Sequence, residues 1–195
     1  MKRAFSLALM AGVLAASGAS AQSVLPFSAE IRGGLGITNG EFREADPDIS
    51  TAPGGVGVSA TVAFGFLPGV AVYGGYDRYV FNATVLGIDA EYVDQGFVAG
   101  ARIAPPIGAL LGFNPWVRGG ILFHDIELTE VDEKSDRSTG FEIGGGIDIP
   151  LGMVLSFTPG VIFRSYSPSF DGGDTGTADG SVQYFDLSVG LRARI

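Results

Sequence analysis

Apolar and polar residues alternate along the chain in eight segments, each bounded by turn-forming residues. Successive side chains of a strand point to opposite faces, so this alternation predicts β-strands with one apolar and one polar face. Most of the segments are close to the ~10 residues that a tilted strand needs to cross a bilayer. The strands are expected at residues 28–37, 56–66, 70–81, 92–103, 116–126, 140–149, 153–165 and 182–195.

The connections between these segments alternate between two classes. Leu67-Pro68-Gly69 and Pro150-Leu151-Gly152 are tight turns, and residues 104–115 form a somewhat longer one. The other four connections are long and polar, at residues 38–55, 82–95, 125–140 and 166–181. Short turns at one end and long loops at the other are typical of outer-membrane barrels. We therefore predict an all-β fold, an eight-stranded antiparallel transmembrane β-barrel, closed by the last strand beside the first because an open edge in lipid leaves backbone groups unsatisfied.

The N-terminus has the pattern of an export signal. Lys2 and Arg3 precede an apolar stretch at residues 4–16, and Ala19-Ser20-Ala21 matches an A-x-A cleavage site. We expect residues 1–21 to be a signal peptide and residues 22–195 to be one barrel domain. The sequence contains no cysteine, which excludes a disulfide scaffold.

The acidic residues are concentrated in the long connections. The chain carries a formal net charge of −9, and 16 of its 21 acids lie in the four predicted loops. Such loops argue against a nucleic-acid partner, which needs a basic patch. They would be repelled by the phosphates of lipopolysaccharide unless divalent cations bridged the two. We expect outer-membrane lipid, lipopolysaccharide and possible extracellular ligands as partners, and we expect no cofactor and no resident metal.

The charged residues of the strands nearly all have even numbers, opposite to the apolar residues around them. An eight-stranded barrel is just wide enough for side chains to fill its interior, and charges buried there need partners. The expected lumen charge network consists of Glu30, Arg32, Arg78, Asp94, Arg102, Arg118, His124, Glu142, Asp148, Asp186 and Arg192.

Opposed residues of an antiparallel pair share a face, which allows trial registers. One register of the hairpin over residues 116–149 places Arg118 opposite Asp148 and His124 opposite Glu142. A register of the hairpin before it places Arg78 opposite Asp94.

Two residues do not fit this scheme. Asp77 shares the parity of Tyr73, Tyr79 and Phe81, which we interpret as lipid-facing, so Asp77 is expected at the outer rim. Pro159 interrupts the seventh strand and implies a β-bulge, which leaves the facing of that strand undefined.

Three stretches carry a family resemblance. Residues 115–121 (PWVRGGI) and 141–148 (FEIGGGID) resemble consecutive strands of small OmpA/OmpX/Opa-like outer-membrane barrels. The chain end resembles the C-terminal assembly signal of bacterial outer-membrane proteins, although Ile replaces the usual terminal aromatic. The positions of that signal are Ser188, Gly190, Ala193 and Ile195. The resemblance implies residence in the cell outer membrane and recognition by the barrel-assembly machinery, but no single activity.

Three functions are compatible with these patterns. The first is a non-enzymatic barrel with a structural and surface-interaction role through its acidic loops. The alternative is a narrow channel for small solutes or ions. The third is a lipid-modifying enzyme, which resembles lipid A deacylases only through His124, since the Ser expected at position 126 is Ile126. The acidic stretch 171–179 lacks the spacing and closing Glu of an EF-hand calcium loop.

Overall fold

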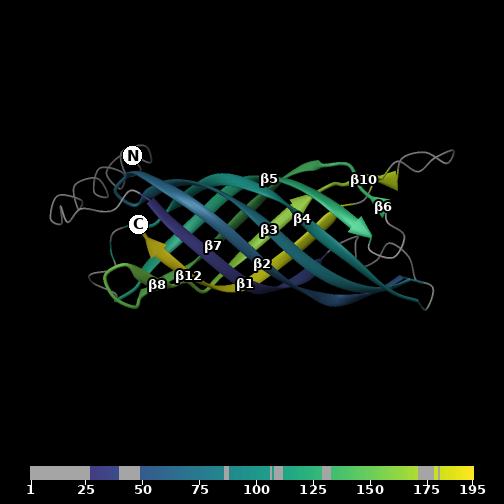
Figure 1. Cartoon of the computed structure of the whole chain (residues 1–195), viewed down its shortest axis with the longest axis horizontal. Coiled ribbons are helices and arrows are strands. Elements are labelled where there is room, and N and C mark those ends of the chain that lie inside the picture. The colour runs from purple at the N-terminus through teal and green to yellow at the C-terminus, as the bar shows by residue number, and fades with distance from the viewer. Residues whose placement is uncertain are drawn as a thin grey trace, which may run out of the picture.

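The strands form one closed barrel in the computed structural model, which describes residues 27–39, 49–85, 88–105, 107, 112–128, 133–170, 178–179 and 181–195 (Figure 1). The strands of the wall are β1 (Phe27–Asn39), β2 (Ile49–Leu67), β3 (Val70–Val85), β4 (Ile88–Ile103), β5 (Asn114–Leu128), β7 (Ser138–Pro150), β8 (Leu155–Phe157), β9 (Gly160–Tyr166) and β12 (Val182–Arg194). Three two-residue strands lie beside the long connections: β6 (Glu133–Lys134), β10 (Ser169–Phe170) and β11 (Ala178–Asp179). Within the described residues, no helix is long and apolar enough to cross a membrane.

The wall is a ring of eight antiparallel positions, because β8 and β9 together occupy one of them. Each strand pairs with its neighbours along the chain, and β12 pairs with both β9 and β1. The pairing of β12 with β1 runs from Ser28 opposite Arg194 to Asn39 opposite Gln183. The predicted barrel and its closure by the last strand beside the first are confirmed.

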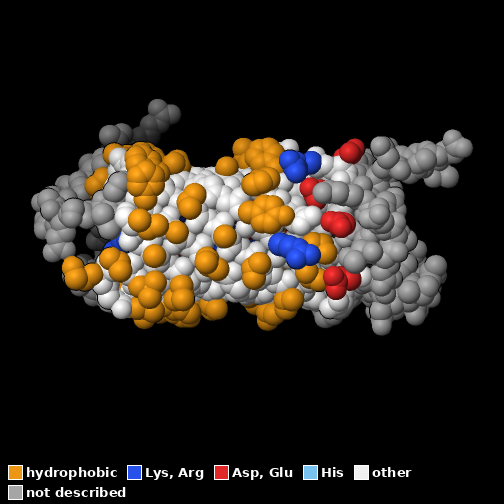
Figure 2. Space-filling view, in the orientation of Figure 1, with side chains coloured by type: hydrophobic (Ala, Val, Ile, Leu, Met, Phe, Trp, Pro, Cys, Tyr) orange, Lys and Arg blue, Asp and Glu red, His pale blue; other side chains and the backbone are white. Residues whose placement is uncertain are grey.

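The two ends of the barrel differ. The tight connections and the end of β12 lie at one end, which we call the turn end, and β6 and β10 lie at the other, the loop end (Figure 1). Apolar side chains cover the outer wall, where Ile31, Val62 and Ile143 are more than half exposed (Figure 2). In β12 the pattern alternates buried and exposed positions, as expected for a wall with a polar lumen inside and lipid outside.

The strands extend further toward the loop end than the alternation predicts. β3 and β4 pair as far as Val85 and Ile88, so most of the predicted 82–95 loop is strand. β5 and β7 likewise extend into the predicted 125–140 loop. Above the bilayer a strand no longer needs one apolar face, so its apolar alternation ends before its hydrogen bonding does. Residues 128–138 therefore include strand residues at both ends, at Leu128 and at Ser138.

The facing predicted for β3 is wrong. Tyr73, Tyr79 and Phe81 point into the lumen together with Asp77, which is fully buried, whereas Arg78 is exposed on the outer wall. The aromatic rings fit inside because glycines face them: a side chain at Gly57 would collide with the ring of Tyr79. An aromatic residue is as useful for filling a narrow lumen as for facing lipid, so its parity alone does not identify the lipid side.

The trial registers also differ from the observed ones. Arg118 lies opposite Gly144 and Asp148 lies opposite Asn114, which is a shift of four residues from the expected pairing. Between β3 and β4, Arg78 lies opposite Gln95 and not Asp94. The shift of four between β5 and β7 is even and keeps every side chain on its predicted face, so facing cannot select among such registers. The shift of one between β3 and β4 reflects the wrong facing predicted for β3.

Pro159 interrupts hydrogen bonding without a β-bulge. The register of β7 with β8 continues unchanged with β9, and the same holds on the β12 side. Thr158 exchanges both backbone hydrogen bonds with Gly190, while Pro159 accepts one from the amide of Ile147. Proline has no N–H to return to Ile147, so the cost of Pro159 is one ladder hydrogen bond. The expected bulge is wrong, and the facing of the seventh wall position is regular.

Candidate functional site: the lumen charge network

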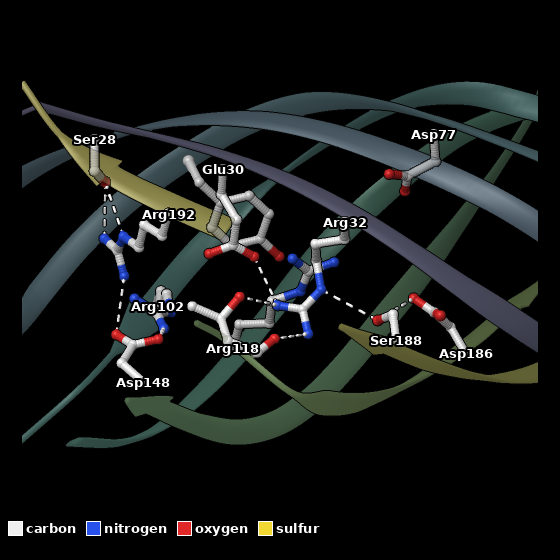
Figure 3. Close-up of polar contacts among 12 residues, drawn as sticks. Ser28, Glu30, Arg32, Asp77, Arg102, Arg118, Asp148, Asp186, Ser188 and Arg192 are labelled. Atoms are coloured by element: carbon white, nitrogen blue, oxygen red, sulfur yellow. Dashed lines mark hydrogen bonds and ion pairs between the residues drawn. The ribbon is translucent and has the colours of Figure 1, made fainter. Parts of the chain in front are cut away.

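The lumen is lined by ion pairs that begin at the turn end (Figure 3). The carboxylate of Asp148 lies 2.7 Å from Nη2 of Arg102 and 3.6 Å from Nη1 of Arg192. Arg192 also donates hydrogen bonds of 3.1 and 2.8 Å to Oγ of Ser28. These four residues form the turn-end cluster, in which β1, β4, β7 and β12 are cross-linked by side chains across the lumen.

Arg32 connects this cluster to the middle of the barrel. Its Nη1 lies 2.6 Å from Oε1 of Glu30, and its Nε donates a 3.1 Å hydrogen bond to Ser188. The indole ring of Trp116 has two guanidinium neighbours, with Arg32 5.2 Å and Arg102 4.8 Å from the ring centroid. Each of these cation–π contacts stabilises a buried charge.

Arg164 is the centre of the network. Its side chain is completely buried, and its guanidinium lies 3.0 Å from Asp77, 3.1 Å from Asp186 and 3.3 Å from Glu142. The ring of Tyr79 lies 5.0 Å from the same guanidinium. Three carboxylates from three other strands therefore converge on one cation. Because a buried charge without a partner is expensive, removal of Arg164 would leave Asp77 and Asp186 uncompensated.

Glu142 joins this centre to the opposite wall. It pairs with Nε of Arg118 at 3.0 Å and accepts a hydrogen bond from the hydroxyl of Tyr73. Tyr73 reaches it past Gly100 and Gly120, where a Cβ would lie 2.7 Å from the Tyr73 hydroxyl. These two glycines thus provide the space that lets a tyrosine cross the lumen.

Toward the loop end the network gives way to aromatic rings. Nδ1 of His124 lies 2.7 Å from Oδ1 of Asp94, and the hydroxyl of Tyr184 donates to the other carboxylate oxygen at 2.7 Å. Around them the rings of Tyr79, Phe81, Tyr92 and Tyr184 pack at centroid distances of 5.2 to 6.3 Å. These four rings form the aromatic layer.

The packed lumen leaves little free volume. A cavity between the turn-end cluster and Tyr73 measures about 10 Å³, roughly the minimum that holds one water molecule. In the described part of the chain, no group of three or more His, Cys, Asp or Glu side chains could hold a metal ion. Ser138 lies opposite His124 on β7, but no hydrogen bond joins their side chains in the described residues. The His124–Asp94 pair is a buried polar contact under aromatic rings.

The structure places the predicted network residues as follows. Ten of the eleven line the lumen: Glu30, Arg32, Asp94, Arg102, Arg118, His124, Glu142, Asp148, Asp186 and Arg192. Arg78 is the exception and lies on the outer wall. The expected partners are wrong, because Arg118 pairs with Glu142 instead of Asp148, and His124 pairs with Asp94 instead of Glu142.

Two central residues were missing from the prediction. Arg164 was left out because of the bulge expected at Pro159, and Asp77 because of the aromatic residues that share its parity. The signal available for Arg164 was its even number, which matches the predicted lumen-facing charges. Ile162 and Tyr166, which have the same parity in β9, are also buried.

The positions resembling an assembly signal lie on both faces of β12. Ser188 and Gly190 are buried toward the lumen, whereas Ile195 is exposed at the turn end and Ala193 is partly exposed. A Cβ at Gly190 would lie 2.8 Å from the side chain of Arg32, so this glycine makes room for an arginine of the network. Their role as a signal stays a prediction.

Comparison with known proteins places this architecture in a family. No curated protein matches the sequence. The structure resembles Neisserial surface protein A, with a TM-score of 0.66 and 12% identity over 87% of this chain and 97% of that chain. It also resembles the outer membrane protein OprG from Pseudomonas aeruginosa, with a TM-score of 0.52 and 15% identity over 86% of this chain and 96% of that chain. Such low identities show a shared fold. The outer membrane protein beta-barrel domain family matches residues 6–194, and the chain therefore belongs to this family of Gram-negative outer-membrane proteins.

Proposed function

We propose that this protein is a non-enzymatic outer-membrane barrel with a structural and surface-interaction role, exerted through its acidic extracellular loops. The observation that carries the proposal is the filled lumen. Arg32, Arg164, Tyr79 and Tyr184 are among its largest fully buried side chains, and the cavity near the turn end is about 10 Å³. Because the interior offers a solute no path, the surfaces that remain for function are the outer wall and the loops.

The buried state of His124 supports the non-enzymatic part of the proposal. The side chain is fully buried, packed 5.6 Å from the ring of Tyr166, and paired with Asp94. A lipid-modifying reaction would need an acyl carbonyl to reach a nucleophile beside the imidazole. The aromatic layer occupies that approach.

The charge of the predicted loops supports a partner class. The first loop alone carries four acids (Glu41, Glu44, Asp46, Asp48) and one base, Arg43. Hard divalent cations bind carboxylate and phosphate oxygens together. We therefore propose lipopolysaccharide as a loop partner through bridging Mg²⁺ or Ca²⁺. The barrel-assembly machinery is a further proposed partner, through Ser188, Gly190, Ala193 and Ile195 during insertion.

Binding to lipopolysaccharide vesicles tests the proposal. The refolded protein should bind more tightly with Mg²⁺ than with EDTA. This gain in affinity, the Mg²⁺ increment, should become smaller as the salt concentration rises. A variant with E41Q, E44Q, D46N and D48N should fold normally and lose much of the Mg²⁺ increment. Neutralising the fourth loop instead (D171N, D174N, D179N) shows whether one loop or all loops contribute. Equal binding by all proteins with and without Mg²⁺ would overturn the loop-mediated role.

A further inference from the structure

A row of aromatic side chains marks the membrane boundary on the outer wall of β3, β4 and β5. Tyr76, Phe97 and Phe123 are direct cross-strand neighbours, and all three are exposed. The rings of Tyr76 and Phe97 are 5.3 Å apart and in edge contact. Aromatic girdles of membrane barrels lie at the interface between acyl chains and headgroups. Residues one step further toward the loop end therefore lie at the level of the outer-leaflet headgroups.

Two arginines lie at this level of the outer-leaflet headgroups. Arg78 follows Tyr76 on the outer face of β3, is exposed, and makes no ion pair within the described part of the chain. Arg137 is 58% exposed, and its guanidinium lies 5.9 Å from the ring centroid of Phe97. Figure 2 shows basic side chains between the apolar band and the acidic residues nearer the loop end.

The side chains between the two arginines are already paired. Gln95, opposite Arg78, accepts a hydrogen bond from Tyr76 and donates one to Glu127. Asp125 is opposite Gln95, buried, and 3.6 Å from Arg137. On this part of the outer wall, the hydrogen-bond donors that point outward are consequently the guanidiniums of Arg78 and Arg137.

The opposite side of the barrel has the same girdle without the charges. Phe141, Phe163 and Phe185 form a second aromatic row on β7, β9 and β12, with centroids 6.0 and 5.1 Å apart. The outward positions one step closer to the loops are Thr139, Ser165 and Gln183. An aromatic row at the membrane boundary thus does not require arginines beside it. The arginines at the headgroup level are a feature of the β3–β5 side.

We propose that Arg78 and Arg137 form a binding site for the phosphates of lipid A on the outer wall of β3–β5. Arginine forms charge-assisted, bidentate hydrogen bonds with phosphate oxygens, and such bonds strengthen where acyl chains exclude water. Lipid A presents its phosphates at the headgroup level of the outer leaflet, where both guanidiniums lie. The site rests on the proposed role of lipopolysaccharide as partner, but differs from the loop contacts in needing no divalent cation.

Titration of the folded protein in detergent with lipid A, in the presence of EDTA, tests this site. R78Q and R137Q should each weaken binding roughly tenfold, because each loses a charge-assisted hydrogen bond to a phosphate. The double variant should bind lipid A no better than dephosphorylated lipid A. R194Q is the matched control, because it removes the same charge from an exposed side chain at the turn end and should bind as the wild type does.

Each other outcome has a defined meaning. Wild-type affinity in R78Q and R137Q overturns the site, as does equally tight binding of phosphatidylglycerol, which would make the site unselective for lipid A. If the Mg²⁺ increment is absent while the EDTA-resistant binding depends on both arginines, the loop-mediated function is wrong and this site stands. If the double variant loses the EDTA-resistant binding but keeps the Mg²⁺ increment, both proposals are supported.

Discussion

At the scale of single residues, Arg164 holds the lumen together because it is the one guanidinium on which Asp77, Asp186 and Glu142 converge. Replacing it with methionine keeps most of the volume but leaves Asp77 and Asp186 without their cation, whereas Glu142 keeps Arg118. We expect R164M to lower the free energy of unfolding by about 3–5 kcal/mol, as for other broken buried ion pairs. Urea unfolding in lipid vesicles measures this.

The matched control for that prediction is R192M at the turn end. The side chain of Arg192 is 15% exposed and its ion pair with Asp148 is longer, at 3.6 Å. Asp148 is buried but keeps its 2.7 Å ion pair with Arg102 in R192M, so we expect a clearly smaller loss. Equal losses for the two variants would show that Arg164 has no special role.

The facing of most charged residues was predictable from numbering parity, and the exceptions have a common cause. Parity assigns two faces but does not say which of them is the lumen. In β3 both faces carry aromatic residues, Tyr73 and Tyr79 on one and Tyr76 on the other. The partners of Arg118 and His124 lie on hydrogen-bonded neighbouring strands, one step along the same face from the directly opposed position: Glu142 is opposite Gly120 and Asp94 is opposite Ile126. They were not predictable because the trial registers considered only directly opposed residues.

At the scale of the strands, the existence, order and closure of the wall followed from the alternation, whereas the registers did not. A register depends on where the hairpin turns and how far it extends beyond the membrane. The chain between β5 and β7 carries no apolar alternation to define either. The register that pairs Arg118 with Asp148 and the observed register, in which Arg118 lies opposite Gly144, give the same apolar outer face. Only the structure therefore separates the two registers.

Disulfide trapping checks the observed β5–β7 register in a chain that has no cysteine of its own. Phe123 lies opposite Thr139 on the outer wall, so F123C with T139C should form a disulfide on mild oxidation. F123C with I143C corresponds to the register shifted by four residues. That pair is separated by roughly 13 Å along the strand, beyond the ~7 Å reach of a disulfide. Cross-linking of the second pair and not the first would refute the register.

At the scale of the whole molecule, three layers block the lumen in series. The turn-end cluster, the pairs around Arg164 and the aromatic layer follow one another from the turn end to the loop end, and each is built from several strands. Opening one layer leaves the other two in place. A single local fluctuation that opens one layer therefore does not create a pore.

Planar-bilayer recording tests this arrangement directly. We expect no steady single-channel current from the wild type, because an eight-stranded lumen filled by side chains has no continuous water path. R102A with D148A removes one ion pair of the turn-end cluster as a unit and should also remain closed. Adding D77A, R164A, Y79A and Y184A to R102A with D148A opens both remaining layers and should produce brief currents, because no intact layer then blocks the lumen. Large, steady currents from the wild type would overturn the blocked lumen and favour the narrow-channel alternative, in which the ion pairs must exchange partners as a solute passes.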